Sequence, residues 1–247
     1  MYYCATYSAK RGKPTSEPGV RGARFVAWLL ACAVCLTLTT ASAEEATAAQ
    51  PTELGTLLGR LATAPGVSAH FREKKKIALL SAPLESEGDV YFTHPPALLR
   101  RVTSPEASTI LLRDGRLLIS DASGQRSIAL SAHPAMQTLA ESFLYVLSGD
   151  RAALEKVYTM QFKGTAAGDW SLELVPRDAA LSKLLRELSV TGTGLVVKTL
   201  RLVESSGDVS TTEFSAVDTQ RRFSDSEKQT LFGPPSPPSP PGPPSPR

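Results

Sequence analysis

The stretch from Pro83 to Ser120 constrains the fold more than any other part of this 247-residue chain. It reads as at least four short strands separated by tight turn signals, the strongest being Asp114-Gly115 between the apolar runs 109–112 and 117–120. An Asp-Gly pair between two apolar runs is typical of a two-residue β-hairpin, because both positions tolerate a left-handed backbone. The stretch therefore predicts an antiparallel meander.

The remaining sequence extends this pattern and interrupts it with helices. Leu54, Leu57, Leu58 and Leu61 have helical spacing within 51–64, and a second apolar stripe runs from Met136 to Leu147. Asp150 and Asp178 are expected N-caps of helices that extend to Tyr158 and over 179–186. Strands are expected at 67–79, 89–93, 98–103, 109–112, 117–120, 125–130, 160–164, 170–175, 188–191, 195–204 and 209–214. The predicted fold class is α+β, with about eleven strands in one curled antiparallel sheet and helices covering its concave face.

The first 43 residues are predicted to be a secretory signal peptide. Arg21 and Arg24 precede a 16-residue apolar run, 25–40, and the A-x-A pattern 41–43 follows it. A transmembrane helix needs about 20 apolar residues, so the shorter run with its processing site indicates cleavage after Ala43. Residues 1–19 are long and polar for such a leader, which indicates an overlong start, with translation beginning near Val20.

Removing this leader changes the composition of the chain. It takes away five of the 27 basic and one of the 24 acidic residues, which leaves 22 and 23. Nucleic-acid binding, which needs a clustered basic face, is therefore not expected. All three cysteines also lie in the leader. Lipidation at Cys32 is an alternative, but Cys32 sits inside the apolar run, whereas a mature lipoprotein normally continues into polar residues.

The mature chain divides into three parts by composition. Residues 44–50 form a polar lead-in, and 51–232 are expected to form one domain of about 180 residues with one ordinary core. Residues 233–247 are rich in proline, which prevents helix and sheet ladders and favours an extended, disordered tail.

No pattern in the mature chain points to catalysis. G-x-S-x-G, H-E-x-x-H, C-x-x-C and P-loop motifs are absent, and His70, His94 and His133 lie far apart without metal-ligand spacing. The aspartates recur beside glycines, where turn and cap chemistry explains them. We therefore expect no catalytic residue, no metal and no cofactor. A hydrolase that acts on acyl or glycosyl bonds would need a convergent cluster that the sequence does not single out.

The charge run Arg72 to Lys76 has two interpretations. It fits a solvated or edge stretch of strand, because lysines discourage pairing at a sheet edge. The alternative is a patch that meets lipid headgroups or a partner protein.

The apolar runs 110–112 and 117–119 are apolar on both faces of their strands. Either the sheet is covered on both sides, or one face lines a hydrophobic cavity, and the residues leave both options open. An acyl chain gains about 0.8 kcal/mol per buried CH₂, so burial alone could drive a lipid carrier. The candidate lining residues are Phe71, Val90, Phe92, Leu98, Ile110, Leu112, Leu117, Ile119, Leu139, Phe143, Leu147, Trp170 and Leu172.

The order of several short motifs resembles the LolA family of periplasmic outer-membrane lipoprotein carriers, and the later motifs resemble a divergent LolA-related branch. The matching pieces are 83–92 (PLESEGDVYF), 95–100 (PPALLR), Asp114-Gly115, 147–154 (LSGDRAAL), 170–178 (WSLELVPRD) and Gly207-Asp208. They span roughly Leu54 to Phe214, and they carry the resemblance by their order and spacing.

This resemblance implies an unclosed (half) β-barrel with a helical lid over an apolar cavity. It also implies a periplasmic protein that takes acylated lipid or lipoprotein cargo from an inner-membrane exporter or donor complex to an outer-membrane acceptor. The family carries an arginine just before the proline that follows the second strand, and that arginine helps latch the lid. Here His94 occupies the position, so His94 is the lid-latch candidate.

The leading functional hypothesis is thus a monomeric periplasmic carrier without catalysis, with no nucleic-acid partner. The alternative is an accessory envelope-assembly protein that docks on a lipid or aryl polyene exporter and has no cargo cavity of its own. A lidded cavity would favour the first hypothesis, and a filled core with an exposed apolar patch would favour the second.

Overall fold

The computed structural model describes residues 52–233, so the expected signal peptide, the lead-in and residues 234–247 lie outside the described residues. The helices are α1 (Glu53–Ala62), α2 (Pro134–Leu147), α3 (Arg151–Val157), α4 (Ala179–Ser182) and α5 (Asp225–Phe232), with a 3-10 turn at Leu130–Ala132. The strands are β1 (Gly66–Lys76), β2 (Leu84–Thr93), β3 (Ala97–Ser104), β4 (Ser108–Arg113), β5 (Arg116–Asp121), β6 (Gly124–Ala129), β7 (Tyr158–Gly164), β8 (Asp169–Pro176), β9 (Leu185–Thr193), β10 (Val196–Glu204) and β11 (Val209–Asp218).

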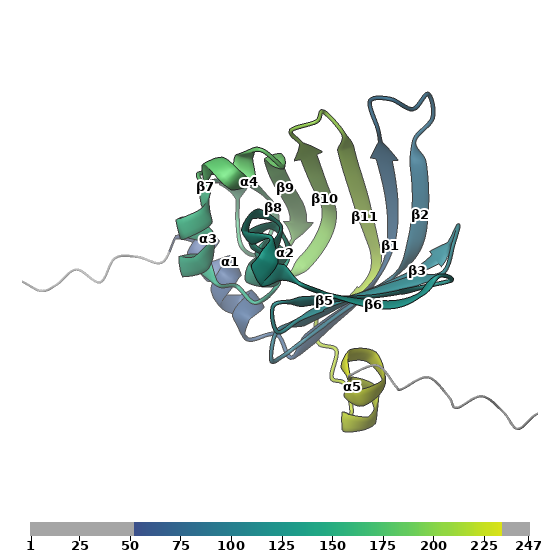
Figure 1. The fold of residues 1–247 in the computed structure, drawn as a ribbon. Helices are drawn as coiled ribbons and strands as arrows, with labels where there is room; N and C mark the ends of the chain where they lie inside the picture. The colour runs from purple at the N-terminus through teal and green to yellow at the C-terminus, as the bar shows by residue number, and fades with distance from the viewer. Residues whose placement is uncertain (1–51, 234–247) are drawn as a thin grey trace, which may run out of the picture. The chain divides into compact units, whose positions relative to one another are not determined.

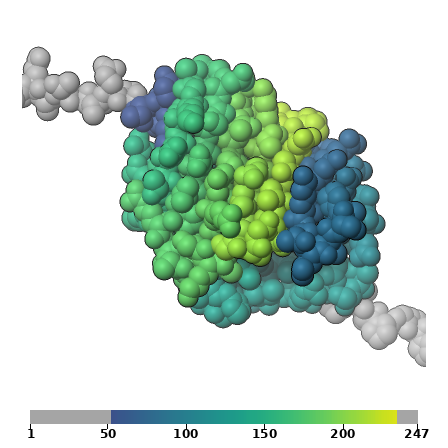
Figure 2. Space-filling model, turned by 90° about the horizontal axis from the view of Figure 1, so that it is seen from above, coloured from purple at the N-terminus to yellow at the C-terminus, as the bar shows by residue number. Residues whose placement is uncertain are grey.

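All eleven described strands form one antiparallel sheet in the order β6-β5-β4-β3-β2-β1-β11-β10-β9-β8-β7. The first and last strands pair in the middle, so the yellow-green β11 lies beside the blue β1–β2 hairpin (Figure 2). Strands β6 and β7 are the edges and do not pair with each other, so the sheet curls without closing (Figure 1). The predicted α+β fold with an unclosed sheet is confirmed.

Local turn and cap chemistry explains where several elements begin and end. The β4–β5 hairpin turns at Asp114 and Gly115 with φ angles of 50° and 66°, as the Asp-Gly signal predicted. The Asp150 side chain accepts a hydrogen bond from the Ala153 amide at the start of α3. The Asp178 side chain likewise accepts from the Leu181 amide. Both predicted caps are confirmed.

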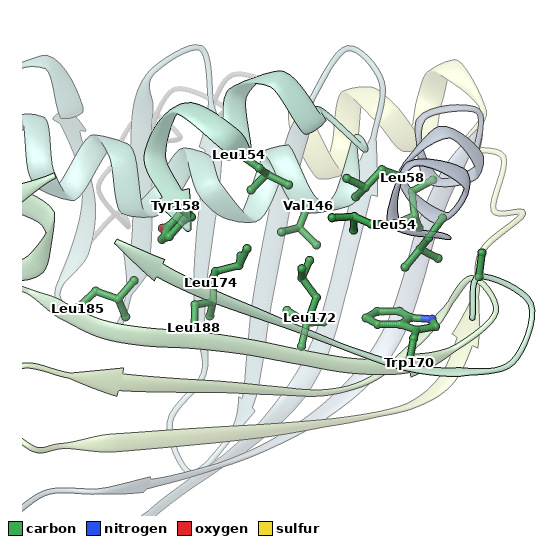
Figure 3. Close-up of a cluster of buried hydrophobic side chains, with 14 of the residues drawn as sticks. Leu54, Leu58, Val146, Leu154, Tyr158, Trp170, Leu172, Leu174, Leu185 and Leu188 are labelled. Carbon is green, nitrogen blue, oxygen red and sulfur yellow. The ribbon is translucent and has the colours of Figure 1, made fainter. Parts of the chain in front are cut away.

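The larger hydrophobic core lies between helices α1 to α4 and the sheet half that ends in β7. Figure 3 shows Leu54 and Leu58 of α1 above Trp170 and Leu172 of β8, whose side chains point towards the helix. Further along, Leu154 of α3 packs in the same cluster, which also includes the start of β7 and part of β9. The leucine stripe of α1 is therefore buried against one half of the concave face.

A second, smaller core lies on the opposite face of the sheet. There Leu99 and Leu111 pack against Phe223 and Phe232, which flank or end α5. Figure 1 shows α5 outside the curl of the sheet. The apolar runs of β4 and β5 are therefore covered on their convex side by a helix that the apolar periodicity did not predict.

Two local predictions are wrong. The helix expected over 179–186 ends at Ser182, because the chain enters β9 at Leu185 and Leu185 pairs with Glu204. The edge interpretation of the charge run is also wrong, since β1 pairs with β2 on one side and β11 on the other as far as Lys75, whereas the solvated interpretation holds, because the Arg72 and Lys74 side chains are exposed. Its charges are instead balanced by neighbouring strands, for example by Glu85 opposite Lys74.

Candidate functional site

A cavity of about 400 Å³ lies between α2 and the concave face of the sheet. Helices contribute Leu61, Met136, Leu139, Ala140, Phe143, Val146 and Leu147; β1 to β5 contribute Val67, Ala69, Phe71, Glu73, Val90, Phe92, Leu98, Arg100, Ile110, Leu112 and Leu117. Strands β9 to β11 and the β9–β10 turn contribute Leu188, Val190, Leu195, Val197, Leu200, Thr212, Phe214 and Val217. Its size falls within the range of about 300–1,000 Å³ that is typical of small-molecule sites.

Strand alternation explains why this wall is apolar. In β1, Val67, Ala69 and Phe71 have the same parity and all line the cavity. In β3, Leu98 lines the cavity, whereas its neighbour Leu99 lies in the outer cluster under α5. The strands that are apolar on both faces therefore combine the two options: their concave face lines the cavity, and their convex face is covered by α5.

The structure places most of the candidate lining residues around this one cavity. Those in the lining are Phe71, Val90, Phe92, Leu98, Ile110, Leu112, Leu117, Leu139, Phe143 and Leu147. Trp170 and Leu172 lie outside it, because α1 packs over β8 and buries both in the core. Ile119 also lies outside the lining, two residues beyond Leu117 towards the end of β5.

Sequence reasoning missed the part of the lining that comes from the C-terminal strands. Leu188 and Val190 of β9, Leu200 of β10 and Phe214 of β11 face the same space as β1 to β5. The period-2 alternation of these strands was visible, but it did not say which face is concave. The pairing of β1 with β11 brings this half of the sheet to the cavity.

Helix α2 is held firmly at its C-terminal half. Ser142 and Tyr158 are both fully buried, and their hydroxyl groups are 2.7 Å apart. Gly149, just after α2, has a φ of 65°, and a Cβ there would collide with the carbonyl oxygen of Leu58 in α1. The other end of α2 is more open, because Met136 is 44% exposed while it lines the cavity. The helix is therefore a cover that is anchored at one end.

The pKa values of two tyrosines reflect the packing of α2. Burial raises the pKa of the Tyr158 hydroxyl, and the hydrogen bond with Ser142 offsets this in part. On the same helix as Ser142, burial and the Glu141 carboxylate raise the pKa of Tyr145 to about 12. The Tyr145 hydroxyl donates to Glu141 over 2.8 Å. Both tyrosines are therefore neutral near pH 7.

A small polar cluster interrupts the apolar wall. The guanidinium of Arg100 stacks over the Phe71 ring at 4.4 Å and lies 3.3 Å from the Glu73 carboxylate. Arg100 also donates to the Ser86 hydroxyl over 3.1 Å, and Thr212 donates to Glu73 over 3.0 Å. Strands β1, β2, β3 and β11 each supply one or more of these side chains.

The lid-latch candidate His94 follows β2 and is not in the cavity lining. Its ring meets the Phe92 ring edge-on, with centroids 5.1 Å apart. The buried Nε2 atom has no hydrogen-bond partner among residues 52–233, and no hydrogen bond in this range joins the His94 side chain to a helix. The latch role therefore stays a prediction.

Over the described part of the chain, no three His, Cys, Asp or Glu side chains gather as a metal site. Within the same range, no helix has the length and apolar character to cross a membrane.

Comparison with known proteins supports this description. A family model described as "Outer membrane lipoprotein carrier protein LolA-like" matches residues 46–229. No curated protein matches the chain.

Three solved structures show the degree of similarity to known folds. A LolA superfamily protein from Nitrosomonas europaea is 14% identical with a TM-score of 0.40, over 69% of this chain and 94% of that one. The lipoprotein LppX from Mycobacterium tuberculosis is 12% identical with a TM-score of 0.40, over 70% and 96%. MucB, in complex with MucA from Pseudomonas aeruginosa, is 14% identical with a TM-score of 0.42, over 71% of this chain but only 60% of that one.

Proposed function

Because the chain belongs to the LolA-like family of outer membrane lipoprotein carrier proteins, we propose that it is a periplasmic carrier of acylated cargo. The acyl chains of a lipoprotein or another lipid occupy the cavity under α2, and the protein carries them from an inner-membrane donor towards the outer membrane. The predicted signal peptide provides entry to the periplasm.

The observation that carries this proposal is the apolar cavity. Within the described range 52–233, all lining residues except Glu73, Arg100 and Thr212 have apolar side chains. At about 0.8 kcal/mol per CH₂, a sixteen-carbon chain gains on the order of 12 kcal/mol from burial, before the cost of moving the lid. Transfer of the cargo then needs a change in the lid and no chemical step.

The anchoring of α2 suggests how the lid moves. Its C-terminal half is held by Ser142 and by the close approach of Gly149 to α1, whereas Met136 near its N-terminal end is partly exposed. Cargo therefore enters by displacement of the N-terminal half of α2. The alternative, an accessory that docks on an exporter and has no cargo cavity, is disfavoured because the cavity is present.

The decisive test is native mass spectrometry of the protein purified from its own periplasm, together with titration of a fluorescent long-chain acyl ester. We expect a co-purifying acylated species and saturable binding of the acyl ester. Absence of both would rule out the carrier function.

Two tryptophan variants localise this binding. Ala140→Trp fills the cavity and should abolish binding, because Ala140 lies on the lining face of α2. Ala152→Trp adds the same side chain at an exposed position of α3 and should bind normally. Equal binding by the two variants would place the acyl ester outside the cavity.

A further inference from the structure

Among residues 52–233, Arg100 provides the only cationic group in the cavity lining, and apolar lining residues flank it on both neighbouring strands. Its cross-strand neighbours are Val90 on β2 and Ile110 on β4, and both line the cavity. Two residues earlier on the same face is Leu98. A ligand that fills this apolar space therefore also covers part of the Arg100 side chain.

The hydrogen bonds of Arg100 leave most of its donors available. Both of its polar contacts, to Ser86 and to Glu73, use the Nη2 nitrogen. A guanidinium carries five N–H donors, so the donors on Nε and Nη1 have no acceptor among residues 52–233. The side chain is 30% exposed, which lets water serve these donors when no cargo is bound.

Cargo that displaces this water must replace the hydrogen bonds that the water accepts from Arg100. A buried donor without a partner costs free energy comparable to its desolvation, and a pure hydrocarbon offers no acceptor. The cargo therefore needs an oxygen acceptor next to Arg100, at the point where its acyl chain begins to follow Leu98 and Ile110.

The charge of the site decides which oxygen fits. Glu73 already neutralises Arg100, and the carboxylate is fixed in place by Thr212. A second carboxylate, such as that of a free fatty acid, would be repelled by Glu73. A neutral carbonyl accepts from Arg100 and keeps the pair neutral.

We propose that Arg100 binds the carbonyl oxygen of the cargo's acyl ester or amide, so that the cavity selects acylated molecules over free fatty acids and over ether lipids. This inference rests on the carrier function proposed above and names the chemical class of its cargo. Glu73 acts as the residue that disfavours an anionic ligand.

The test compares four sixteen-carbon ligands by displacement of a fluorescent apolar dye from the purified protein. 1-Monopalmitoylglycerol and 1-O-hexadecylglycerol differ only in the ester carbonyl, N-palmitoylethanolamine carries an amide, and palmitate carries a carboxylate. We expect the ester or the amide to bind at least about tenfold more tightly than the ether, because a hydrogen bond to a charged group is being made or lost. The tighter binder of the ester and the amide identifies the linkage of the acyl chain in the cargo.

Variants assign the preference to its residues. Arg100→Met should bring the ester and ether affinities within about twofold of each other, whichever way the absolute affinities move, because only the ester loses a hydrogen bond to Arg100. Arg101→Met is the matched control, because Arg101 stacks over Tyr91 and has no place in the cavity lining. Glu73→Gln should improve the binding of palmitate relative to the ester.

The outcomes separate this inference from the carrier function. Equal binding of ester, amide and ether by the unchanged protein would overturn the role of Arg100 and leave the carrier function standing, and this result does not depend on the folding of any variant. Failure of all four ligands to bind would instead contradict the carrier function itself.

Discussion

Ser142 and Tyr158 join α2 to the start of β7 through hydroxyl groups 2.7 Å apart, and neither residue is exposed to solvent. Ser142 also donates to the backbone carbonyl of Thr138 in the preceding helical turn. Ser142 belongs to α2, which covers the cavity, and Tyr158 belongs to the edge strand β7. The pair therefore fixes the anchored end of the cover.

Replacement of Ser142 by alanine should destabilise the protein. It leaves the buried Tyr158 hydroxyl without its partner, which costs about 1–3 kcal/mol of unfolding free energy. Urea denaturation measures the loss. The double variant Ser142→Ala, Tyr158→Phe should recover part of it. Ser182→Ala should change little, because Ser182 is exposed and its hydroxyl makes only a local bond within α4. A Ser142→Ala variant as stable as the unchanged protein would show that this bond does not anchor α2.

Gly149 and Gly115 form a natural pair for testing how closely α2 approaches α1. Their φ angles are 65° and 66°, so alanine is equally strained at both positions. A Cβ at Gly149 would collide with the Leu58 carbonyl, whereas nothing lies near a Cβ at Gly115. We expect Gly115→Ala to cost about 1 kcal/mol and Gly149→Ala clearly more. Equal losses in thermal denaturation would mean that the α1–α2 contact gives way without cost.

The raised pKa values of Tyr145 and Tyr158 predict a loss of stability in alkali. The pKa of Tyr145 is about 12 in the folded protein, and that of Tyr158 is also raised, while an unfolded tyrosine ionises near its usual value of about 10. Between these values the unfolded state has released protons that the folded state retains, so the unfolding free energy falls as the pH rises. Below pH 9 the unfolding free energy should not depend on the ionisation of Tyr145 or Tyr158. Tyr145→Phe should flatten the decline between about pH 10 and 12, and an unchanged slope would count against the raised pKa.

The curled sheet and its elements follow from local sequence patterns, because turn signals and alternation are local. Local patterns do not determine which face of each strand lies towards the cavity. Leu98 and Leu99 are equally apolar, yet one lines the cavity and the other lies under α5. Trp170 has the same apolar character as the cavity residues, but α1 packs over it, and the position of α1 depends on contacts far apart in sequence.

Helix α5 also could not be predicted from a local apolar pattern. It has few apolar residues, so no stripe predicts it. The signal that could have found it is the capping box at its start, where Ser224 and Glu227 satisfy each other's backbone amides. Its role depends on Phe223 and Phe232, which pack on strands more than 90 residues earlier in the chain.

The two apolar faces of the sheet should respond independently to mutation. Phe232→Ala removes a buried ring that packs edge-on against Phe223 with centroids 5.5 Å apart. Because α5 lies at the end of the domain, we expect it to detach locally, with faster amide exchange over 225–232 and new dye binding on the exposed Leu99 and Leu111. Binding of the fluorescent acyl ester in the cavity should stay unchanged, because no residue of α5 lines it.

Lys228→Ala on the exposed side of α5 provides the control and should alter neither exchange nor dye binding. Ala140→Trp should give the opposite pattern to Phe232→Ala, with lost cavity binding and a protected α5. If Phe232→Ala also weakened binding of the acyl ester, the outer helix and the cavity would be coupled through β3 and β4. The separation of the sheet into a covered face and a binding face would then be wrong.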